Sequence, residues 1–300
     1  MYAAIDIGTN SVRLLLYSEE TGKKQKFLTT TRIGEGLSAT GRLSKAAMDR
    51  TRTAVWDYCE AAIRHGAKAP IPCYATSAVR EAENGADFMA ALNQKETLTA
   101  EVISGEAEAH YGYAGAVKGG SGLVMDIGGG STELILGEKG NILKARSMVL
   151  GCVTSLESCI KNDPPLKEEI DALRAYAAER AVALKHSVLG EDDCTELIGI
   201  GGTATQLAMV LLGLREYDPQ KVNGYRMKYE KLSELFSVMA AMPLAHRKEM
   251  PGMDPKRADV IVTGCAIALE MMAACGANTL IACDDDGLDG YLMAHIAENS

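Results

Sequence analysis

The apolar positions of the chain form two patterns, short runs typical of buried strands and longer segments with the spacing of helices. The short runs predict strands over residues 2–7, 12–17, 26–31, 70–74, 101–103, 143–149, 196–200 and 279–283, and a strand, turn and strand over 125–136. The longer segments predict helices over residues 44–65, 86–93, 104–117, 165–189, 229–239 and 256–275, one opened by residues 201–203 and one from residue 288. Strands that alternate with helices favour an α/β fold with mostly parallel sheets.

The opening pattern of the chain returns 120 residues later. Residues 125–136 align with residues 5–16, and six of the twelve positions are identical. Both copies consist of a strand, a glycine turn and a second strand, so we predict an internal duplication into two similar α/β domains. The glycines near residue 120 predict a linker, with one domain over 1–118 and the other over 119–285. A terminal helix, about 286–300, could pack back on the first domain.

Composition is consistent with two domains and narrows the class of protein. A chain of 300 residues with 47% apolar residues can bury two cores. A net charge of −9 disfavours a broad nucleic-acid-binding surface. The sequence has no basic leader and no apolar run of membrane-spanning length, so we expect a cytoplasmic protein without a membrane partner. Eight cysteines without a C-x-x-C pair predict reduced thiols, neither a zinc site nor a disulfide framework.

Three glycine-rich turns are candidates for phosphate binding, at residues 8–11, 128–132 and 201–203. Glycine lets backbone N–H groups approach phosphate oxygens closely. A single turn of this kind is more often a plain hairpin, but the first two are duplicated and each follows an aspartate at a strand end. These aspartates, Asp6 and Asp126, can hold Mg²⁺, or each can cap its own turn.

Five segments together resemble the exopolyphosphatase and guanosine pentaphosphate phosphatase (Ppx/GppA) family. They are residues 6–11 (DIGTNS), 32–37 (RIGEGL), 75–80 (ATSAVR), 103–105 (ISG) with Glu108, and 126–133 (DIGGGSTE). Residues 201–203 and 257–259 extend the resemblance to nearly the whole chain. The chain is similar to the short members of the family, which lack extra C-terminal helical domains.

The resemblance implies both a fold and an activity. The fold is two duplicated actin-like (ASKHA, ribonuclease H-like) domains with the active site in an interdomain cleft. The activity is hydrolysis of the terminal phosphoanhydride of inorganic polyphosphate, or of pppGpp to ppGpp, with release of orthophosphate and with Mg²⁺ or Mn²⁺ as cofactor. Family members are often homodimers, and the sequence has no interface pattern that decides this here.

The resemblance also assigns roles to residues. Glu108 falls on the carboxylate that activates the attacking water, and Arg80 on a cleft arginine suited to bidentate phosphate contact. We assign Asp126, Glu133 and Asp6 to the metal, although Glu133 could equally be an outward residue of a hairpin. The residues expected to bind substrate phosphates are Gly8, Thr9, Asn10, Ser11, Arg32, Gly128, Gly129, Gly130, Ser131, Thr132, Gly201 and Gly202.

The chain departs from the family pattern in two places. Ala107 and His110 replace a glutamate and an arginine beside Glu108, and the remaining Glu106 cannot share a helix face with Glu108. Where the family reads Gly-Leu-Arg-x-Gly, residues 284–290 are acidic and contain no arginine. Polyphosphate and pppGpp therefore both stay open as substrates. Two other functions also stay open: an actin-like ATPase or kinase, and an alarmone or nucleotide sensor with little turnover.

Overall fold

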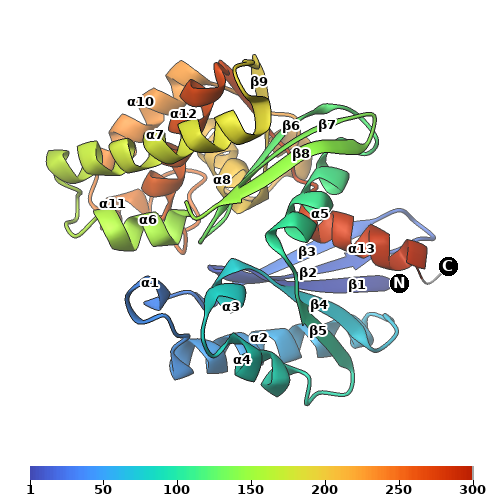
Figure 1. Cartoon of the computed structure of the whole chain (residues 1–300). Coiled ribbons are helices and arrows are strands. Elements are labelled where there is room, and N and C mark those ends of the chain that lie inside the picture. Colours follow the sequence, from blue (N-terminus) through green and yellow to red (C-terminus); the bar gives the residue numbers. More distant parts are fainter. Residues whose placement is uncertain (299–300) are drawn as a thin grey trace. The chain divides into compact units, whose positions relative to one another are not determined.

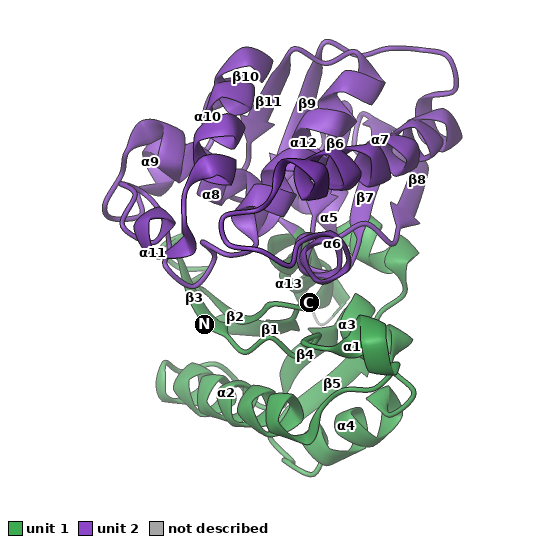
Figure 2. Ribbon diagram, turned by 90° about the vertical axis from the view of Figure 1, so that its left-hand side faces the viewer, with its two compact units in different colours: residues 1–111, 287–300 green, residues 112–286 purple. Residues whose placement is uncertain are grey.

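The computed structural model describes residues 1–298 and divides into two compact units. Unit 1 contains residues 1–111 and the C-terminal segment that starts at Gly287, and unit 2 contains residues 112–286 (Figure 2). Asn299 and Ser300, the end of the predicted terminal helix, lie outside the described residues. The first unit is therefore built from both ends of the chain.

Unit 1 is a five-stranded sheet covered by helices on both faces. The strand order is β3-β2-β1-β4-β5, with β1, β2 and β3 antiparallel and with β4 and β5 parallel to β1 (Figure 1). The strands are β1 Tyr2–Ile7, β2 Ser11–Tyr17, β3 Lys24–Thr30, β4 Ile71–Ala75 and β5 Leu98–Val102. The helices are α1 Leu37–Thr40, α2 Lys45–Arg64, α3 Ser77–Glu81, α4 Gly85–Leu92, α5 Gly105–Val117, which continues into unit 2, and α13 Gly287–Glu298.

Alternating side chains of this sheet enter two separate cores, as the period of a strand requires. Ile5 and Ile7 are buried with residues of α2 and α4. Ala4 and Leu15, on the opposite face of the sheet, are buried with residues of α13. Tyr291 of α13 is 3% exposed and belongs to this second core. The helix at the end of the chain thus completes a core formed by its first strands.

Unit 2 repeats the same architecture with one extra strand. Its order, β8-β7-β6-β9-β11-β10, matches that of unit 1 over the first five strands. The strands are β6 Gly122–Ile127, β7 Thr132–Glu138, β8 Asn141–Met148, β9 Glu196–Ile200, β10 Arg226–Lys228 and β11 Thr279–Ala282. The helices are α6 Cys152–Cys159, α7 Lys167–Leu189, α8 Gly201–Leu212, α9 Pro219–Val222, α10 Tyr229–Ala241, α11 Leu244–Arg247 and α12 Ile261–Cys275. The predicted duplicated actin-like fold is confirmed.

Most predicted elements exist, and the errors lie at their ends. The helix predicted over 256–275 begins at Ile261. The residues before it form turns instead, one of which is closed by the bond from Val260 N–H to Arg257 O. The fifth strand of unit 1 covers Leu98–Val102, where residues 101–103 were predicted. Strand β10 and five helices, α1, α3, α6, α9 and α11, were not predicted. All of them are short, so their apolar periodicity is too brief to recognise.

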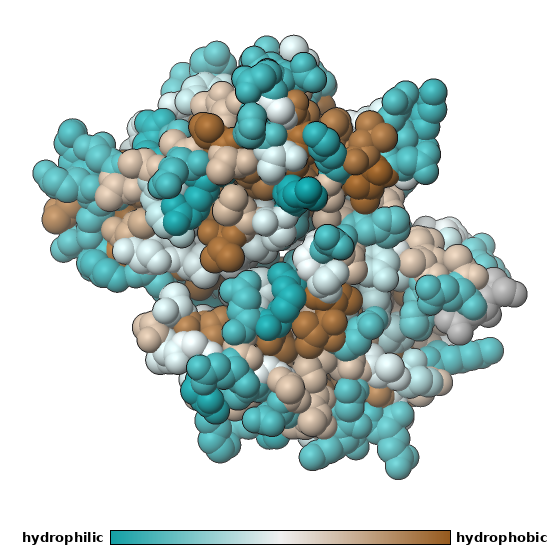
Figure 3. Space-filling model, in the orientation of Figure 1, coloured by the Kyte–Doolittle hydropathy of each residue, from teal (hydrophilic) through white to brown (hydrophobic). Residues whose placement is uncertain are grey.

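Hydrophilic side chains cover most of the face drawn in Figure 3, with smaller apolar patches between them. Within residues 1–298, no helix combines the length and the apolar composition that crossing a membrane requires.

Candidate functional site

In unit 1, the predicted site residues follow the carboxyl ends of three parallel strands. The first glycine turn follows β1, the segment 75–80 follows β4, and the segment that leads to Glu108 follows β5. Ligands of open α/β sheets bind at this edge. Thr9 and Ser77 link the first two segments, since their hydroxyl oxygens are 3.1 Å apart.

The turn between β1 and β2 has both paired and unpaired backbone N–H groups among residues 1–298. The N–H of Gly8 donates to Ser11 O at 3.0 Å and closes the turn, and the carbonyl of Asn10 accepts from Thr31 and Arg32. Among residues 1–298, nothing accepts a hydrogen bond from the N–H groups of Thr9 and Asn10, and the buried amide of Asn10 has no partner. Such a set of donors suits phosphate oxygens.

Arg32 has a strained backbone next to this turn. Its φ is 51°, a left-handed conformation that is uncommon for a residue with a side chain and that often marks functional sites. Arg50 stabilises the conformation from behind, because its Nε and Nη2 donate to the carbonyl of Thr31 at 3.1 and 3.0 Å. The same guanidinium reaches Glu35 at 3.0 Å, on the other side of Arg32.

Glu108 and Arg80, the two predicted catalytic residues, are in contact. Nη1 of Arg80 donates to Oε2 of Glu108 at 3.2 Å and to the carbonyl of Ile103 at 3.0 Å. The side chain of Glu108 is 19% exposed. Burial raises the pKa of Glu108 to about 7 against the opposing effect of Arg80, and Asp6 raises it further. A carboxyl group with this pKa can accept a proton near neutral pH.

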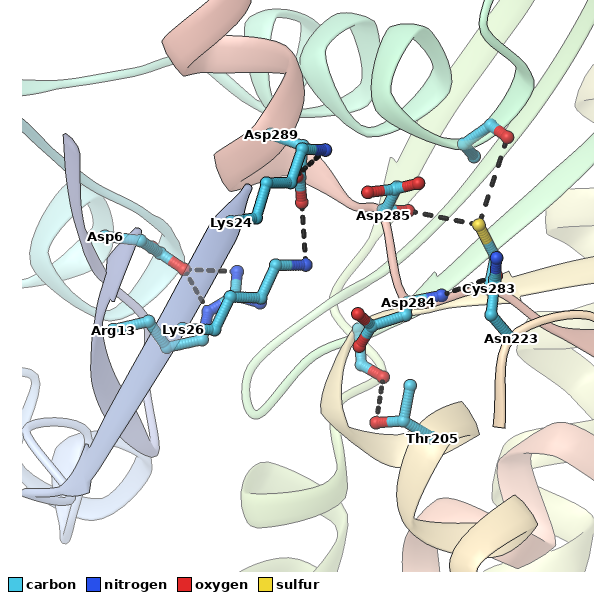
Figure 4. Close-up of polar contacts among 12 residues, drawn as sticks. Asp6, Arg13, Lys24, Lys26, Thr205, Asn223, Cys283, Asp284, Asp285 and Asp289 are labelled. Carbon is cyan, nitrogen blue, oxygen red and sulfur yellow. Dashed lines mark hydrogen bonds and ion pairs between the residues drawn. The ribbon is translucent and has the colours of Figure 1, made fainter. Parts of the chain in front are cut away.

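Asp6 is paired across the hairpin with Arg13. The two residues are opposite each other in the β1–β2 ladder, and Nε of Arg13 donates to Oδ2 of Asp6 at 2.8 Å (Figure 4). Asp6 was predicted to bind metal, and in the structure its carboxylate already faces a cation.

The duplicated turn in unit 2 has the same backbone arrangement. The N–H of Gly128 donates to Ser131 O at 2.9 Å, and the carbonyls of Gly128 and Gly129 accept from the first N–H groups of α6. The N–H groups of Gly129 and Gly130 have no acceptor within the described part of the chain. The two turns thus present equivalent donors, 120 residues apart in sequence.

The two turns differ in the residue opposite the aspartate. Asp126 faces Glu133 in the β6–β7 ladder, at the positions of Asp6 and Arg13. Glu133 is 2% exposed and accepts a hydrogen bond from Ser147 Oγ at 2.5 Å. Two acids on opposite strands repel each other, so this pair suits a cation.

These donors fit the implied metal. No group of three or more His, Cys, Asp or Glu side chains able to hold a metal occurs among residues 1–298. Mg²⁺, however, is commonly bound through one or two carboxylates, with water and phosphate completing its shell. Asp126 and Glu133 provide two such carboxylates.

The third glycine turn follows β9 and opens α8, as predicted. At Gly201, with φ of 74°, a Cβ atom would lie 2.5 Å from Oδ1 of Asp126, and at Gly202 one would lie 2.3 Å from the guanidinium of Arg257. Only glycine permits these approaches. The turn therefore brings backbone, a carboxylate and an arginine together at the amino end of a helix, where anions bind favourably.

A buried arginine, Arg247, holds the main chain next to Arg257. Arg247 is 3% exposed, and its Nη1 donates to the carbonyl of Ala258 at 3.1 Å. Its Nη2 donates to Met242 O at 3.0 Å and to Asp163 at 3.3 Å. Burial lowers the pKa of Arg247.

The acidic residues after β11 have partners of their own. In unit 2, Asp285 pairs with Lys118 at 2.5 Å, and Asp284 binds the hydroxyl of Tyr217. In unit 1, the buried Asp289 pairs with Lys24 at 2.5 Å and with Lys26 at 2.7 Å (Figure 4). Ion pairs thus balance much of the acidic charge that replaces the family's arginine.

The predicted site residues form one cluster in each unit. Unit 1 brings Asp6, Arg80 and Glu108 together around the first turn, and unit 2 brings Asp126, Glu133 and Gly201 together around the other two. Sequence reasoning gave no role to Arg13 or Arg257. The 120-residue offset aligns Arg13 with Glu133, and this alignment could have revealed Arg13. Arg257 could have been found from the segment 257–259, which is already part of the resemblance.

Comparison with known proteins gives consistent results. The model of the Ppx/GppA phosphatase family matches residues 24–294. Exopolyphosphatase 2 of Mycobacterium tuberculosis is 34% identical over 97% of both chains. The guanosine-5′-triphosphate,3′-diphosphate pyrophosphatase of Aeromonas salmonicida is 32% identical over 90% of this chain and 54% of its own length. The crystal structure of the Aquifex aeolicus Ppx/GppA family member superposes with a TM-score of 0.81 at 27% identity, covering 100% of this chain and 98% of the other. The duplicated turns, the Glu108 segment and these matches together make the chain a member of the Ppx/GppA phosphatase family.

Proposed function

We propose that the protein is an exophosphatase that hydrolyses the terminal phosphoanhydride of inorganic polyphosphate, or of pppGpp to give ppGpp, and releases orthophosphate. The observation that carries this proposal is the half-buried Glu108, whose pKa is raised to about 7 beside Arg80. Family membership and the activities named for the relatives support the same reaction class.

In this reaction Glu108 is the general base. It takes a proton from a water whose oxygen forms a new bond to the terminal phosphorus, while the bond from that phosphorus to the bridging oxygen breaks. A pKa near 7 leaves a large fraction of Glu108 ionised at neutral pH and still makes it basic enough to accept the proton. Arg80 orients the carboxylate through their 3.2 Å contact.

The glycine turns and arginines provide the charge stabilisation on which phosphoryl transfer depends. We assign Thr9, Asn10, Gly129 and Gly130 to phosphate through their N–H groups. The remaining predicted positions in these turns shape the backbone that presents the donors. Arg32 and Arg257 supply guanidinium groups for phosphate oxygens.

We assign the divalent metal, Mg²⁺ or Mn²⁺, to Asp126 and Glu133. When bound, the ion would neutralise negative charge on phosphate oxygens. We give Asp6 a different role from the one expected from sequence, because its pairing with Arg13 leaves it to raise the pKa of Glu108.

The test is orthophosphate release by the purified protein with Mg²⁺, using long polyphosphate, short polyphosphate, pppGpp and ATP in parallel. Glu108→Gln keeps the shape of the side chain and removes the base. Glu106→Gln is the matched control, since Glu106 lies two residues away in the same helix and is exposed. We expect release from polyphosphate or pppGpp, a loss of at least about 100-fold in Glu108→Gln, and no change in the control.

Equal release by Glu108→Gln and the wild type would remove Glu108 from the mechanism. Preferential release from ATP would point to an actin-like ATPase. Binding of pppGpp with no release from any of the four compounds would overturn the enzyme proposal in favour of a nucleotide sensor.

A further inference from the structure

Two of the eight cysteines, Cys194 and Cys275, lie side by side in unit 2. The N–H of Cys194 donates to the carbonyl of Cys275 at 2.9 Å, so their main chains are in direct contact. Their side chains therefore lie close enough to interact, and both thiols are reduced. Cys194 lies just before β9, and Cys275 is the last residue of α12.

The surroundings give the two thiols different reactivities. Cys194 is half-buried, and the hydrogen bond from Cys275 lowers its pKa, with a smaller contribution from Lys185. Cys275 is fully buried, and its pKa is raised by the same hydrogen bond and by burial. Cys194 is therefore the accessible nucleophile, and Cys275 is a protonated thiol next to it.

The other cysteines lack this combination. Cys59 and Cys73 lie near each other but are both fully buried, and the pKa of Cys73 is well above its usual value. Cys159 is half-buried like Cys194, but burial raises its pKa. Cys152, Cys265 and Cys283 are buried, and burial raises the pKa of each. Accessibility and a hydrogen-bonded thiol coincide at Cys194.

We propose that Cys194 and Cys275 form a site of reversible oxidation, at which a peroxide converts the two thiols into an intramolecular disulfide. The sulfur of Cys194 attacks one peroxide oxygen, the O–O bond breaks, and a sulfenic acid forms with release of water or an alcohol. The sulfur of Cys275 then attacks the sulfur of Cys194 and displaces its hydroxyl group as a second water. Two thiols are oxidised, one peroxide is reduced, and a thiol reductant reverses the reaction.

The site lies at the far ends of two elements that carry candidate phosphate-binding groups. Strand β9 runs from the residues after Cys194 to the turn at Gly201, and α12 runs from the segment after Arg257 to Cys275. The disulfide would join these elements at the ends away from Gly201 and Arg257. This proposal is independent of the proposed hydrolase activity.

The test is oxidation of the reduced, desalted full-length protein with hydrogen peroxide, followed by alkylation under denaturing conditions and mass spectrometry. We expect one product that lacks two hydrogen atoms, about 2 Da, and that carries two fewer alkyl groups than the reduced protein. Trypsin gives a peptide of residues 186–215, in which Cys194 is the single cysteine. A second peptide, residues 258–300, contains Cys275 together with Cys265 and Cys283. Fragmentation of the linked peptides then identifies the partner.

Variants provide the controls. Cys194→Ser and Cys275→Ala should each abolish the linked product, whereas Cys159→Ser, at the other half-buried cysteine, should keep it. Because Cys275 is buried, its variant could fold poorly, but the wild-type peptide map does not depend on it. A disulfide between other cysteines, or sulfinic acid at Cys194 with Cys275 still alkylated, would overturn the proposal.

Discussion

One pair of equivalent residues gives the two duplicated turns a different charge. Arg13 and Glu133 occupy equivalent positions opposite Asp6 and Asp126, so one turn has a balanced ion pair and the other has two adjacent acids. A salt bridge satisfies the first aspartate, whereas the second aspartate lies opposite a residue of its own charge, an arrangement that favours a nearby cation. The duplicated scaffold has thus diverged in charge at the position to which we assign the metal.

The first prediction concerns pH. Because Glu108 acts as a base only when ionised, kcat/KM should rise with pH through about 7, the raised pKa of its carboxyl. Arg80 lowers this pKa, so Arg80→Gln should move the rise to higher pH by about one unit, besides reducing the rate. Phosphate release measured from pH 5 to 9 tests this, because that range extends about two pH units to each side of the pKa. A rise that stays in place in Arg80→Gln would contradict the assignment.

The second prediction concerns the metal. Glu133→Gln should raise the Mg²⁺ concentration needed for half-maximal phosphate release by about tenfold, because it removes one of two charged donors. Glu138→Gln, at the exposed end of the same strand, is the control and should leave it unchanged. An unchanged Mg²⁺ requirement in Glu133→Gln would place the metal elsewhere, and EDTA should abolish activity in every active variant.

At the scale of elements, two arginines hold the segments that present other arginines. Arg50 of α2 holds the carbonyl of Thr31 next to Arg32, and Arg247 of α11 holds the carbonyl of Ala258 next to Arg257. Both bonds run from a helix to a loop at the carboxyl edge of a sheet. The loops that carry candidate phosphate groups are therefore fixed from behind by rigid elements.

The third prediction tests the contact between α8 and Arg257. Gly202→Ala places a methyl group where the guanidinium of Arg257 now lies, so the arginine must move. Since alanine favours a helix, we expect little loss of stability and an increase in KM of about tenfold, or 1.4 kcal/mol. Arg257→Ala should have a similar effect, and Gly202→Ala should add little in that background. Fully additive effects would show that Gly202 acts independently of Arg257.

The elements also show how far the sequence determines the fold. Helix α2 was predicted closely, because Ser44 caps it through a bond to the N–H of Ala47 and Gly66 follows its end. Strand β10 and helix α6 escaped prediction because three to eight residues carry too little periodicity. The bonds from Arg50 to Thr31 and from Arg247 to Ala258 could not be predicted from the sequence either, since only folding brings these residues together.

At the scale of the molecule, the same five-strand order and the same turn-closing bonds recur in both units. The duplication was visible in twelve residues of sequence, and the topology extends it to whole units. Residues from both ends of the chain build unit 1.

The fourth prediction concerns that arrangement. Tyr291 of α13 packs against Tyr74 and Tyr111, with ring centroids 4.6 and 5.2 Å away. Tyr291→Ala should lower the free energy of unfolding by about 3–5 kcal/mol, the cost of a large cavity. Hydrogen exchange should accelerate in β1 and β4 of unit 1 and stay unchanged in β6 and β9 of unit 2. Equal acceleration in both units would mean that they do not unfold separately.

The split composition of unit 1 has a consequence for synthesis on the ribosome. Residues 112–286 are continuous, so unit 2 has all its strands once β11 has emerged, whereas unit 1 must wait for α13. Domains usually form in the order in which they are translated. Here the second unit can close first, and β1 and β2 keep one apolar face uncovered until α13 has emerged. Chaperones that shield such surfaces would therefore be needed for β1 and β2 while the whole of unit 2 is translated.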